Sequence, residues 1–301
     1  MNSGPVFVDA LARFVFEHSA VRGALVSLDD ACRDILRCHP YPAALKRVLA
    51  ELLAATALLA STLKFKGALV VQLQGDGPVR LLVVECTADL TLRATAQWNA
   101  AAEALPRDAS LAELSGGPAH SRLAISLDPK DGTPIYQGIV ALEATSIALL
   151  FEHYLTKSEQ IDSALAIATS DEHARGLLVQ RLPGAGADDD ATWARAAAIA
   201  RATPPSDFFV DGGAEALLQR RFADDDLRLF KPRTARFACS CSQERVANAL
   251  RMIGRVEVES ILDEQGQVGV TCEFCNRSYT FDAEDARGLF EAPAAPQGAR
   301  H

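Results

Sequence analysis

Apolar side chains recur at three- and four-residue intervals in the first part of the chain, and this spacing predicts helices. The two clearest helices are predicted at residues 29–38 and 42–64, with Pro40 and Pro42 in the gap between them. Within the second stretch, the apolar positions include Leu45, Val48, Leu49, Leu52 and Leu53. We expect this stretch to form a long helix that is buried in the protein core.

Further along the chain, apolar and polar residues alternate, which predicts β-strands. Two alternating runs flank the segment GDGP and predict a hairpin in which Gly75 or Gly77 supplies a positive φ. A second hairpin is predicted around residues 120–142, and two more strands at about 163–183. The N-terminal domain, residues 1–183, is therefore expected to be α+β, with a mostly antiparallel sheet and packed helices.

A change of composition marks the end of this domain. The segment PGAGADDD at residues 183–190 is rich in glycine, alanine and aspartate, which is typical of a domain boundary. Residues 184–231 are expected to form a metastable helical linker, because good helix formers with few large apolar residues depend on docking for their order. A stripe of apolar residues lies in its second half: Leu217, Leu218, Phe222, Leu227, Leu229 and Phe230. An ordinary packed helix face is one interpretation of this stripe, and a binding surface is the other.

Composition and charge narrow the classes of function. The chain of 301 residues is 49% hydrophobic and 23% charged, as expected for a globular protein of two or three modules. Its net charge of -9 provides no overall positive field for nucleic acid or anionic lipid. The N-terminus lacks the features of a secretory signal, and the longest apolar run, residues 48–63, is too short to span a bilayer. We expect a cytoplasmic protein whose partners include neither nucleic acid nor a membrane.

The chain holds seven cysteines, an odd number that favours a reducing compartment. Four of them form two close pairs that are 30 residues apart: Cys239 with Cys241, and Cys272 with Cys275. A tetrahedral Zn²⁺ needs two such pairs of thiolates, brought together by a fold-back of the chain. The spacing predicts one zinc per chain in a small C-terminal domain at residues 232–290, followed by a disordered tail at 291–301.

The segment between the two pairs predicts elements of its own. We expect a helix with Ser242 as its N-cap and Arg245 in its first turns, a short helix near residues 257–262, and a hairpin turn at Asp263 to Gly266. A domain of about 60 residues buries little apolar surface, so metal ligation is expected to supply roughly 10–16 kcal/mol, by analogy with zinc-finger peptides. Loss of the metal is expected to unfold this domain.

Four-cysteine zinc sites serve as structural ribbons, nucleic-acid readers or redox switches. Residues 232–290 hold seven Arg and no Lys against nine acidic residues, so they show no phosphate-binding footprint. A Cys-x-Cys pair can oxidise only to a small, strained ring, and strained disulfides are the labile, regulatory kind. On spacing alone, a permanent ribbon and a redox switch both remain open.

Several motifs together resemble one known family. They are CSCSQERVANAL and CEFCNRSYTF at the two cysteine pairs, and LKFKGALVVQLQGDGPV and YLTKSEQ in the N-terminal domain. These segments are similar to those of the heat-shock protein 33 family, which are redox-regulated holdase chaperones of the bacterial cytosol. The likeness covers residues 5–290 and is specific, because the cysteine pairs and the QLQGDGP hairpin occur in the same relative places.

The resemblance implies a function and a mechanism. In the reduced state the four paired cysteines would bind one zinc, and the chaperone would be inactive. Peroxide or hypochlorous acid, with mild heat, would form two disulfides, release the zinc and unfold the linker; the implied pairs are Cys239–Cys241 and Cys272–Cys275. The protein would then bind unfolding client proteins without ATP, with the six residues of the linker stripe as candidate client-binding residues. The resemblance also implies a dimer when oxidised, and ATP-dependent foldase chaperones as downstream partners.

Other chemistry has less support in the sequence. The chain contains no nucleophile elbow, P-loop or dinucleotide fingerprint, so we do not expect an enzyme. The remaining cysteines, Cys32, Cys38 and Cys86, are expected to be small buried hydrophobes. Five dispersed histidines are expected to lie at the surface or to be satisfied within the core: His18, His39, His120, His153 and His173. Two alternatives stay open, namely an enzyme acting on a small molecule or thiol with a purely structural zinc ribbon, and a constitutive interaction module.

Overall fold

The structure is a computed structural model that describes residues 8–290 except 130–133, 187 and 211. It forms two compact units, and the division falls between Ala238 and Cys239. The α+β class expected from the sequence is confirmed, with mixed sheets and helices. The tail expected at 291–301 lies outside the described residues.

Two six-stranded sheets build the first unit. The first sheet has the order β10 (Leu227–Leu229), β1 (Ala10–Phe16), β2 (Val21–Leu28), β9 (Ala174–Arg181) and β8 (Ser163–Thr169), and β11 (Arg233–Thr234) also pairs with β1. The second has the order β12 (Arg236–Phe237), β5 (Thr91–Trp98), β4 (Val79–Thr87), β3 (Ala68–Gln74), β6 (Arg122–Asp128) and β7 (Tyr136–Ala141). All pairings are antiparallel except that of β12 with β5. The pairings of β11 and β12 place residues 232–238 in the first unit, before the cysteine pairs.

Strands β1 and β2 are not predicted by the sequence pattern, yet they lie near the centre of the first sheet. Both faces of this sheet are covered, so β2 is buried at seven of its eight positions and its sequence shows no alternation. A strand that is apolar on both faces lacks the period of two on which a strand prediction depends.

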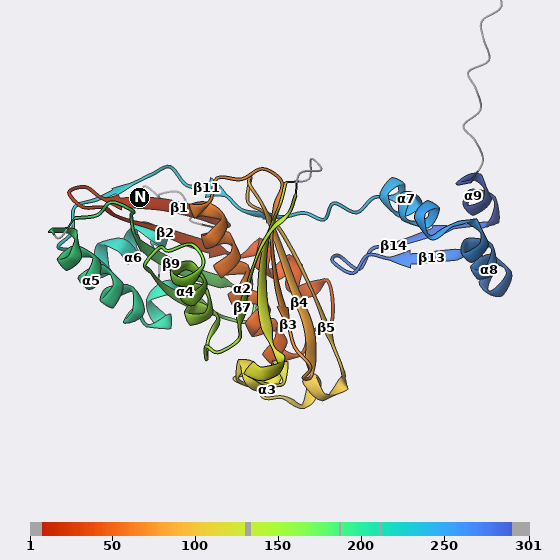
Figure 1. Cartoon of the computed structure of the whole chain (residues 1–301), viewed down its shortest axis with the longest axis horizontal. Coiled ribbons are helices and arrows are strands. Elements are labelled where there is room, and N and C mark those ends of the chain that lie inside the picture. Colours follow the sequence, from red (N-terminus) through yellow and green to blue (C-terminus); the bar gives the residue numbers. More distant parts are fainter. Residues whose placement is uncertain (1–7, 130–133, 187, 211, 291–301) are drawn as a thin grey trace, which may run out of the picture. The chain divides into compact units, whose positions relative to one another are not determined.

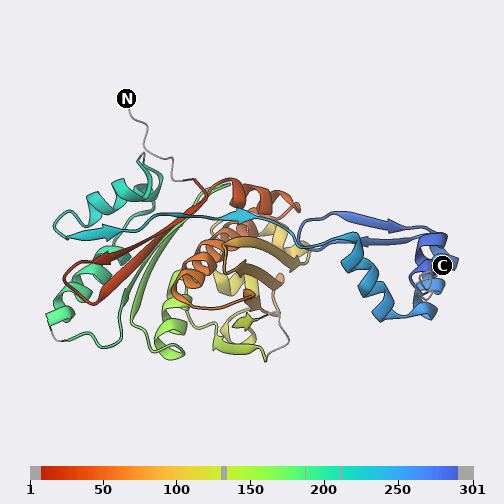
Figure 2. The same cartoon turned by 90° about the horizontal axis from the view of Figure 1, so that it is seen from above.

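The long helix α2 (Ala43–Thr62) lies between the two sheets in both views, as its apolar sequence predicts (Figure 1, Figure 2). It contacts β9 of the first sheet and β4 of the second, and is therefore buried almost all round. Gly176 on β9 permits this approach, because a Cβ there would lie 2.7 Å from Cδ1 of Leu58. Shorter helices complete the unit: α1 (Asp30–Arg37), α3 (Leu111–Ser115), α4 (Ile147–Lys157), η1 (Ala100–Ala104) and η2 (Pro118–His120).

The predicted hairpin of β3 and β4 is confirmed, but the role assigned to its glycines is wrong. Neither Gly75 nor Gly77 has a positive φ. A Cβ on Gly77 would instead lie 2.3 Å from the backbone nitrogen of Gly116, at the end of α3. These positions require glycine because another backbone segment passes close to the turn.

The linker covers the face of the first sheet that is turned away from α2. Its elements are α5 (Asp188–Arg201), η3 (Pro205–Phe209), α6 (Gly213–Arg221) and β10. The interpretation of the apolar stripe as a single packed helix face is wrong, since α6 ends at Arg221 and Leu227–Leu229 is a strand paired with β1. Three aspartates, residues 224–226, follow α6. Negatively charged side chains are unfavourable next to the partial negative charge of a helix C-terminus.

The second unit has a small core of its own, which includes Leu250, Val258 and Phe281. Its elements are α7 (Gln243–Ile253), α8 (Arg255–Gln265), β13 (Val268–Thr271), β14 (Ser278–Phe281) and α9 (Ala283–Gly288). Ser242 caps α7 as predicted, because its Oγ accepts from the backbone nitrogen of Arg245 at 3.2 Å. The hairpin turn predicted at 263–266 is wrong, since α8 continues to Gln265 and Gly266, at φ 74°, forms its C-cap.

Candidate metal centre

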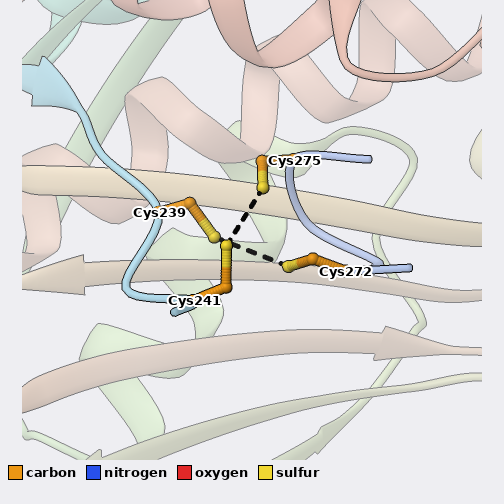
Figure 3. A group of neighbouring side chains, drawn as sticks. All are labelled: Cys239, Cys241, Cys272 and Cys275. Atoms are coloured by element: carbon orange, nitrogen blue, oxygen red, sulfur yellow. Dashed lines mark hydrogen bonds between the residues drawn. The ribbon is translucent and has the colours of Figure 1, made fainter. Parts of the chain in front are cut away.

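Two loops of the second unit bring the four paired cysteines together. Cys239 and Cys241 lie on the segment that precedes α7, and Cys272 and Cys275 lie in the turn between β13 and β14. The four Sγ atoms all lie within 4.8 Å of one another. Figure 3 shows the four side chains pointing toward one another. The structure therefore unites every cysteine that the sequence assigned to the zinc site.

The spacing of the sulfurs fits a tetrahedral metal ion. A zinc ion with Zn–S bonds of about 2.3 Å would separate its ligand sulfurs by about 3.8 Å. The Sγ atoms of Cys239 and Cys272 lie 3.6 Å apart, and those of Cys241 and Cys275 lie 3.3 Å apart. All four thiols are free, and these separations exceed the roughly 2.05 Å of a disulfide bond. The group can hold one metal ion in the reduced state.

The turn between β13 and β14 fixes the second cysteine pair. The backbone nitrogen of Cys272 donates to the carbonyl of Arg277 at 2.9 Å, and that of Asn276 donates to the carbonyl of Cys272 at 2.8 Å. Asn276 has a φ of 57°, in the left-handed region that asparagine tolerates better than most residues. This tight turn directs Cys272 and Cys275 toward the same point.

Polar contacts hold the first cysteine pair. Ser240 lies between the two cysteines, and its Oγ accepts from Nη1 of Arg245 at 2.7 Å. Arg245 in turn follows the Ser242 cap at the start of α7. The Cys-x-Cys segment is thus anchored to the first turn of a helix, which fixes the direction of its side chains.

Tyr279 is a member of the site that sequence reasoning missed. Its hydroxyl donates to Sγ of Cys241 at 3.1 Å from strand β14. Burial raises the pKa of the Cys241 thiol, but the hydrogen bonds from Tyr279 and the neighbouring thiols outweigh it and lower the pKa to about 7. The sequence did offer one indication of this contact. Tyr279 lies on the strand that follows the Cys-x-x-Cys turn, and a side chain at the start of that strand can reach back to the cysteines.

The other shifted thiols of the site are held in the protonated form. Burial, followed by hydrogen bonds from neighbouring thiols, raises the pKa of Cys275 to about 12, and burial is also the main cause of the raised pKa of Cys239. Without a metal, Cys241 is therefore the thiol most readily ionised among these three. A metal ion must displace protons from the others, which couples metal binding to pH.

The remaining cysteines are not part of this cluster. Cys32 and Cys86 are fully buried, as predicted, and burial raises the pKa of each thiol to about 12. The prediction of a buried side chain is wrong for Cys38, which is partly exposed and donates from Sγ to the carbonyl of Asp34 at 3.2 Å. Among the described residues, the only group of three or more cysteine, histidine or acidic side chains placed to hold a metal is the four-cysteine cluster.

The structure separates the residues of the linker stripe. Leu217, Leu218 and Phe222 are buried between the linker and the first sheet. The Phe222 and Phe16 rings meet there edge to face, at 5.7 Å between centroids. Leu227 packs against the margin of the same cluster. Leu229 and Phe230 are 37% and 39% exposed. Three of the six residues therefore face the sheet, and two are already accessible.

The fold and the site together define a class of protein. It is an α+β protein in which a two-sheet unit is followed by a small unit that carries a four-cysteine cluster able to hold a metal ion. The family model described as Hsp33 protein matches residues 9–282. The chain therefore belongs to the Hsp33 family.

Individual relatives agree with this assignment. The chain is 44% identical over 296 residues to a protein of Chromobacterium violaceum, covering 97% of this chain and 98% of the relative, and 45% identical over 285 residues to a protein of Methylobacillus flagellatus, covering 94% of each. Both relatives are named 33 kDa chaperonin. The crystal structure of the 33 kDa chaperonin of Thermotoga maritima shares the fold, with a TM-score of 0.76 at 24% identity over 93% of this chain and 97% of that one. These matches support a chaperone of the Hsp33 type.

No helix in the described parts of the chain combines the length and the apolar character needed to cross a membrane.

Proposed function

We propose that this protein is a redox-regulated, ATP-independent holdase that binds unfolding proteins and prevents their aggregation. In the reduced form, one zinc ion is held by Cys239, Cys241, Cys272 and Cys275, and the holdase is inactive. Four thiolates gathered within 4.8 Å of one another support zinc as the metal, because they form the ligand set of a tetrahedral structural zinc site. The bound metal supplies the link between the two loops that carry the cysteines.

The redox step is a transfer of electrons from thiols to an oxidant of the peroxide class. Each pair, Cys239 with Cys241 and Cys272 with Cys275, is held as thiolates by the metal and gives up two electrons to one peroxide molecule. The peroxide takes two protons from solvent and is reduced to two waters. A disulfide sulfur no longer offers the thiolate that zinc requires, so the ion is released. This pairing of the cysteines rests on the family resemblance and not on the sulfur contacts. Those contacts, at 3.6 and 3.3 Å, join Cys239 to Cys272 and Cys241 to Cys275.

The observation that carries the proposal is the apolar surface beneath the linker. Phe14, Phe16 and Leu177 of the first sheet are at most 4% exposed while the linker covers them. If α5 and α6 detach, these side chains become accessible to unfolding clients, together with buried residues of the linker itself. An apolar surface of this kind is expected at a site that binds other proteins.

The contacts of the linker are consistent with conditional docking. Helix α5 contributes mainly alanines to the interface: Ala196, Ala197 and Ala200. An alanine side chain buries far less apolar area than a leucine, so each contact stabilises docking less. The polar contacts include Arg201, whose Nη2 donates to Oε2 of the buried Glu152 at 2.8 Å. The fully buried side chains of α5 are small, whereas the segment around α6 supplies Leu217, Leu218 and Phe222. Helix α5 is therefore the less firmly held part of the linker, which favours its detachment under mild heat.

Partners and location follow from the same proposal. Unfolding proteins of the cytoplasm are the clients, and ATP-dependent foldase chaperones receive them afterwards. The oxidised protein forms a dimer. The six stripe residues, Leu217 to Phe230, are the proposed client contacts, together with the sheet surface that they border.

The experiment that tests the proposal follows aggregation of a thermally unfolding client by light scattering. The reduced, zinc-loaded protein and the same protein treated with peroxide at mildly elevated temperature are compared, with zinc release monitored in parallel. Oxidised protein is expected to suppress scattering, and reduced protein is not. A Cys38→Ser variant is the matched control, since Cys38 lies outside the cluster. Equal activity of the two forms, or zinc that stays bound under oxidant, would contradict a redox switch.

A further inference from the structure

A cavity of about 300 Å³ opens on the first sheet, on the face that packs against α2. It lies within the first unit, apart from the four-cysteine cluster. Its lining includes two aromatic and five polar residues: Phe14, Phe230, Arg13, Arg22, Gln180, Ser61 and Thr62. Among the described residues that line the cavity, there is no aspartate or glutamate.

A row of hydrogen bonds across the sheet orients Arg22. Its Nε and Nη2 donate to Oε1 of Gln180 at 3.1 and 2.9 Å, and Nε2 of Gln180 donates to Oγ of Ser163 at 3.0 Å. These three residues occupy matched positions on β2, β9 and β8. Gln180 is fully buried, so the row is rigid. The guanidinium has five donors, and two of them serve the row, so others remain for a ligand.

Arg13 brings a second positive charge to the cavity from the neighbouring strand. It is exposed, and its Cζ lies 6.0 Å from the centre of the Phe230 ring. In the described part of the chain, neither Arg13 nor Arg22 forms an ion pair with a carboxylate. Burial lowers the pKa of Arg22, and the nearby charge of Arg13 lowers it further. Two like charges are therefore held together without a counter-charge from the protein.

Arg228 provides an internal comparison. Its Cζ lies 5.5 Å from the centre of the same Phe230 ring, but its Nε is 3.2 Å from a carboxylate oxygen of Glu17, and it does not line the cavity. The chain thus neutralises the arginine outside the cavity and leaves the two inside it uncompensated.

We propose that this cavity binds an anion, namely a carboxylate or phosphate group on a small apolar molecule, between the guanidinium groups of Arg13 and Arg22. Guanidinium groups recognise both kinds of anion through paired, charge-assisted hydrogen bonds. Val15, Leu178 and Phe230 supply an apolar wall for the rest of the ligand. The volume lies at the lower end of the range for small-molecule sites.

The C-terminus of α2 also borders the cavity, and the partial negative charge of a helix C-terminus opposes an anion. Two hydroxyls reduce this effect. Ser61 Oγ donates to the carbonyl of Leu58 at 2.6 Å, and Thr62 Oγ1 donates to the carbonyl of Leu59 at 2.8 Å. The last carbonyls of the helix are thus partly satisfied, and the full charges of the two arginines dominate the cavity.

The site also borders the linker, because Phe230 directly follows β10 and its backbone nitrogen donates to the carbonyl of Arg13 at 2.8 Å. A ligand that contacts Phe230 stabilises the docked position of β10 by mass action. This consequence rests on the proposed function, in which linker detachment activates the holdase. Anion binding itself does not depend on that function.

The test is isothermal titration calorimetry on the full, reduced, metal-loaded chain. The probes are phenyl phosphate and benzoate, with phenol as the uncharged control. We expect saturable binding of at least one anion, and the tighter of the two identifies the phosphate or carboxylate class. Arg13→Gln and Arg22→Gln are each expected to weaken binding at least about tenfold, because each removes charged hydrogen bonds. Arg228→Gln is expected to leave the affinity within about twofold, since Arg228 does not line the cavity.

Further variants keep the test decisive. Arg22→Lys retains the charge but loses the fork and its bonds to Gln180, so its affinity should fall between those of Arg22→Gln and the unaltered chain. Arg13 is exposed, so Arg13→Gln carries the test if Arg22→Gln does not fold by circular dichroism. The proposal is overturned if neither anion binds, if phenol binds equally well, or if folded Arg13→Gln binds as tightly as the unaltered chain. Anion binding in a protein without holdase activity would remove only the consequence for the linker.

Discussion

The hydroxyl of Tyr279 donates a hydrogen bond of 3.1 Å to the sulfur of Cys241, and so joins strand β14 to the segment that carries the first cysteine pair. Groups that hydrogen-bond to metal ligands orient those ligands and tune their basicity. Here the contact favours the thiolate form of Cys241, whose pKa lies near 7 rather than at the usual value of a thiol.

Replacing Tyr279 by phenylalanine is expected to weaken metal binding by about tenfold or more, the usual cost of losing such a contact. The stabilisation from a thiolate with a lowered pKa is present above that pKa and is lost as the pH falls through it. Loss of the bond raises the pKa of Cys241, so the metal should be released at a higher pH than in the unaltered chain. Competition with a colorimetric zinc chelator across a pH series measures both effects. Tyr136→Phe in the first unit, where Tyr136 is 51% exposed, should change neither.

Removal of the metal by a strong chelator under reducing conditions is expected to unfold the second unit and leave the first intact. The core of the second unit is small, whereas that of the first surrounds the buried helix α2. Structural zinc supplies about 10–16 kcal/mol to small domains of this kind. Hydrogen exchange followed by mass spectrometry should show loss of protection over Gln243–Ile253 and retained protection over Ala43–Thr62. Persistent protection of α7 in the metal-free protein would show that its core suffices without the metal.

The variant Phe222→Ala is expected to loosen the linker. Phe222 is 2% exposed and contacts both Phe14 and Phe16, and truncating a buried phenylalanine costs about 3–5 kcal/mol. The oxidised variant should therefore suppress client aggregation at a lower temperature than the unaltered chain. Phe209→Ala is the matched control, because Phe209 is 40% exposed and its ring lies 5.6 Å from Cζ of Arg175. Equal shifts for the two variants would argue against a role for the buried aromatic contact.

Gly77→Ala is expected to destabilise the first unit, although Gly77 has no positive φ. The added Cβ would meet the backbone of Gly116 at 2.3 Å, and overpacking of this kind costs about 1–3 kcal/mol. Gly117→Ala offers the opposite test, since Gly117 has a φ of 95° but no atom within 4 Å of an added Cβ. Its ψ is 166°, a combination that essentially only glycine adopts, so the cost should be about 1–3 kcal/mol from backbone strain alone. Thermal unfolding of the two variants separates the steric effect from the conformational one.

Local patterns were sufficient for much of the fold. The helical spacing around Leu45 and Leu52 predicted α2, and the alternating runs on either side of GDGP predicted β3 and β4. The same reasoning failed for β2, which is covered on both faces and shows no alternation. It also failed after Arg221, where pairing of Leu227–Leu229 with β1 replaced the expected helix. In both cases the deciding contacts come from elements distant in the sequence.

The four cysteines and their arrangement in two close pairs were determined by the sequence alone, because ligand type and spacing are local properties of the chain. Only the tertiary structure decided that Tyr279 meets Cys241, that Gly77 lies against Gly116, and that Arg13 and Arg22 share one cavity. The physical reason is that each of these relationships depends on a distance between side chains or backbones on separate elements. Such distances are set by the packing of sheets and helices, and no residue spacing along the chain encodes them directly.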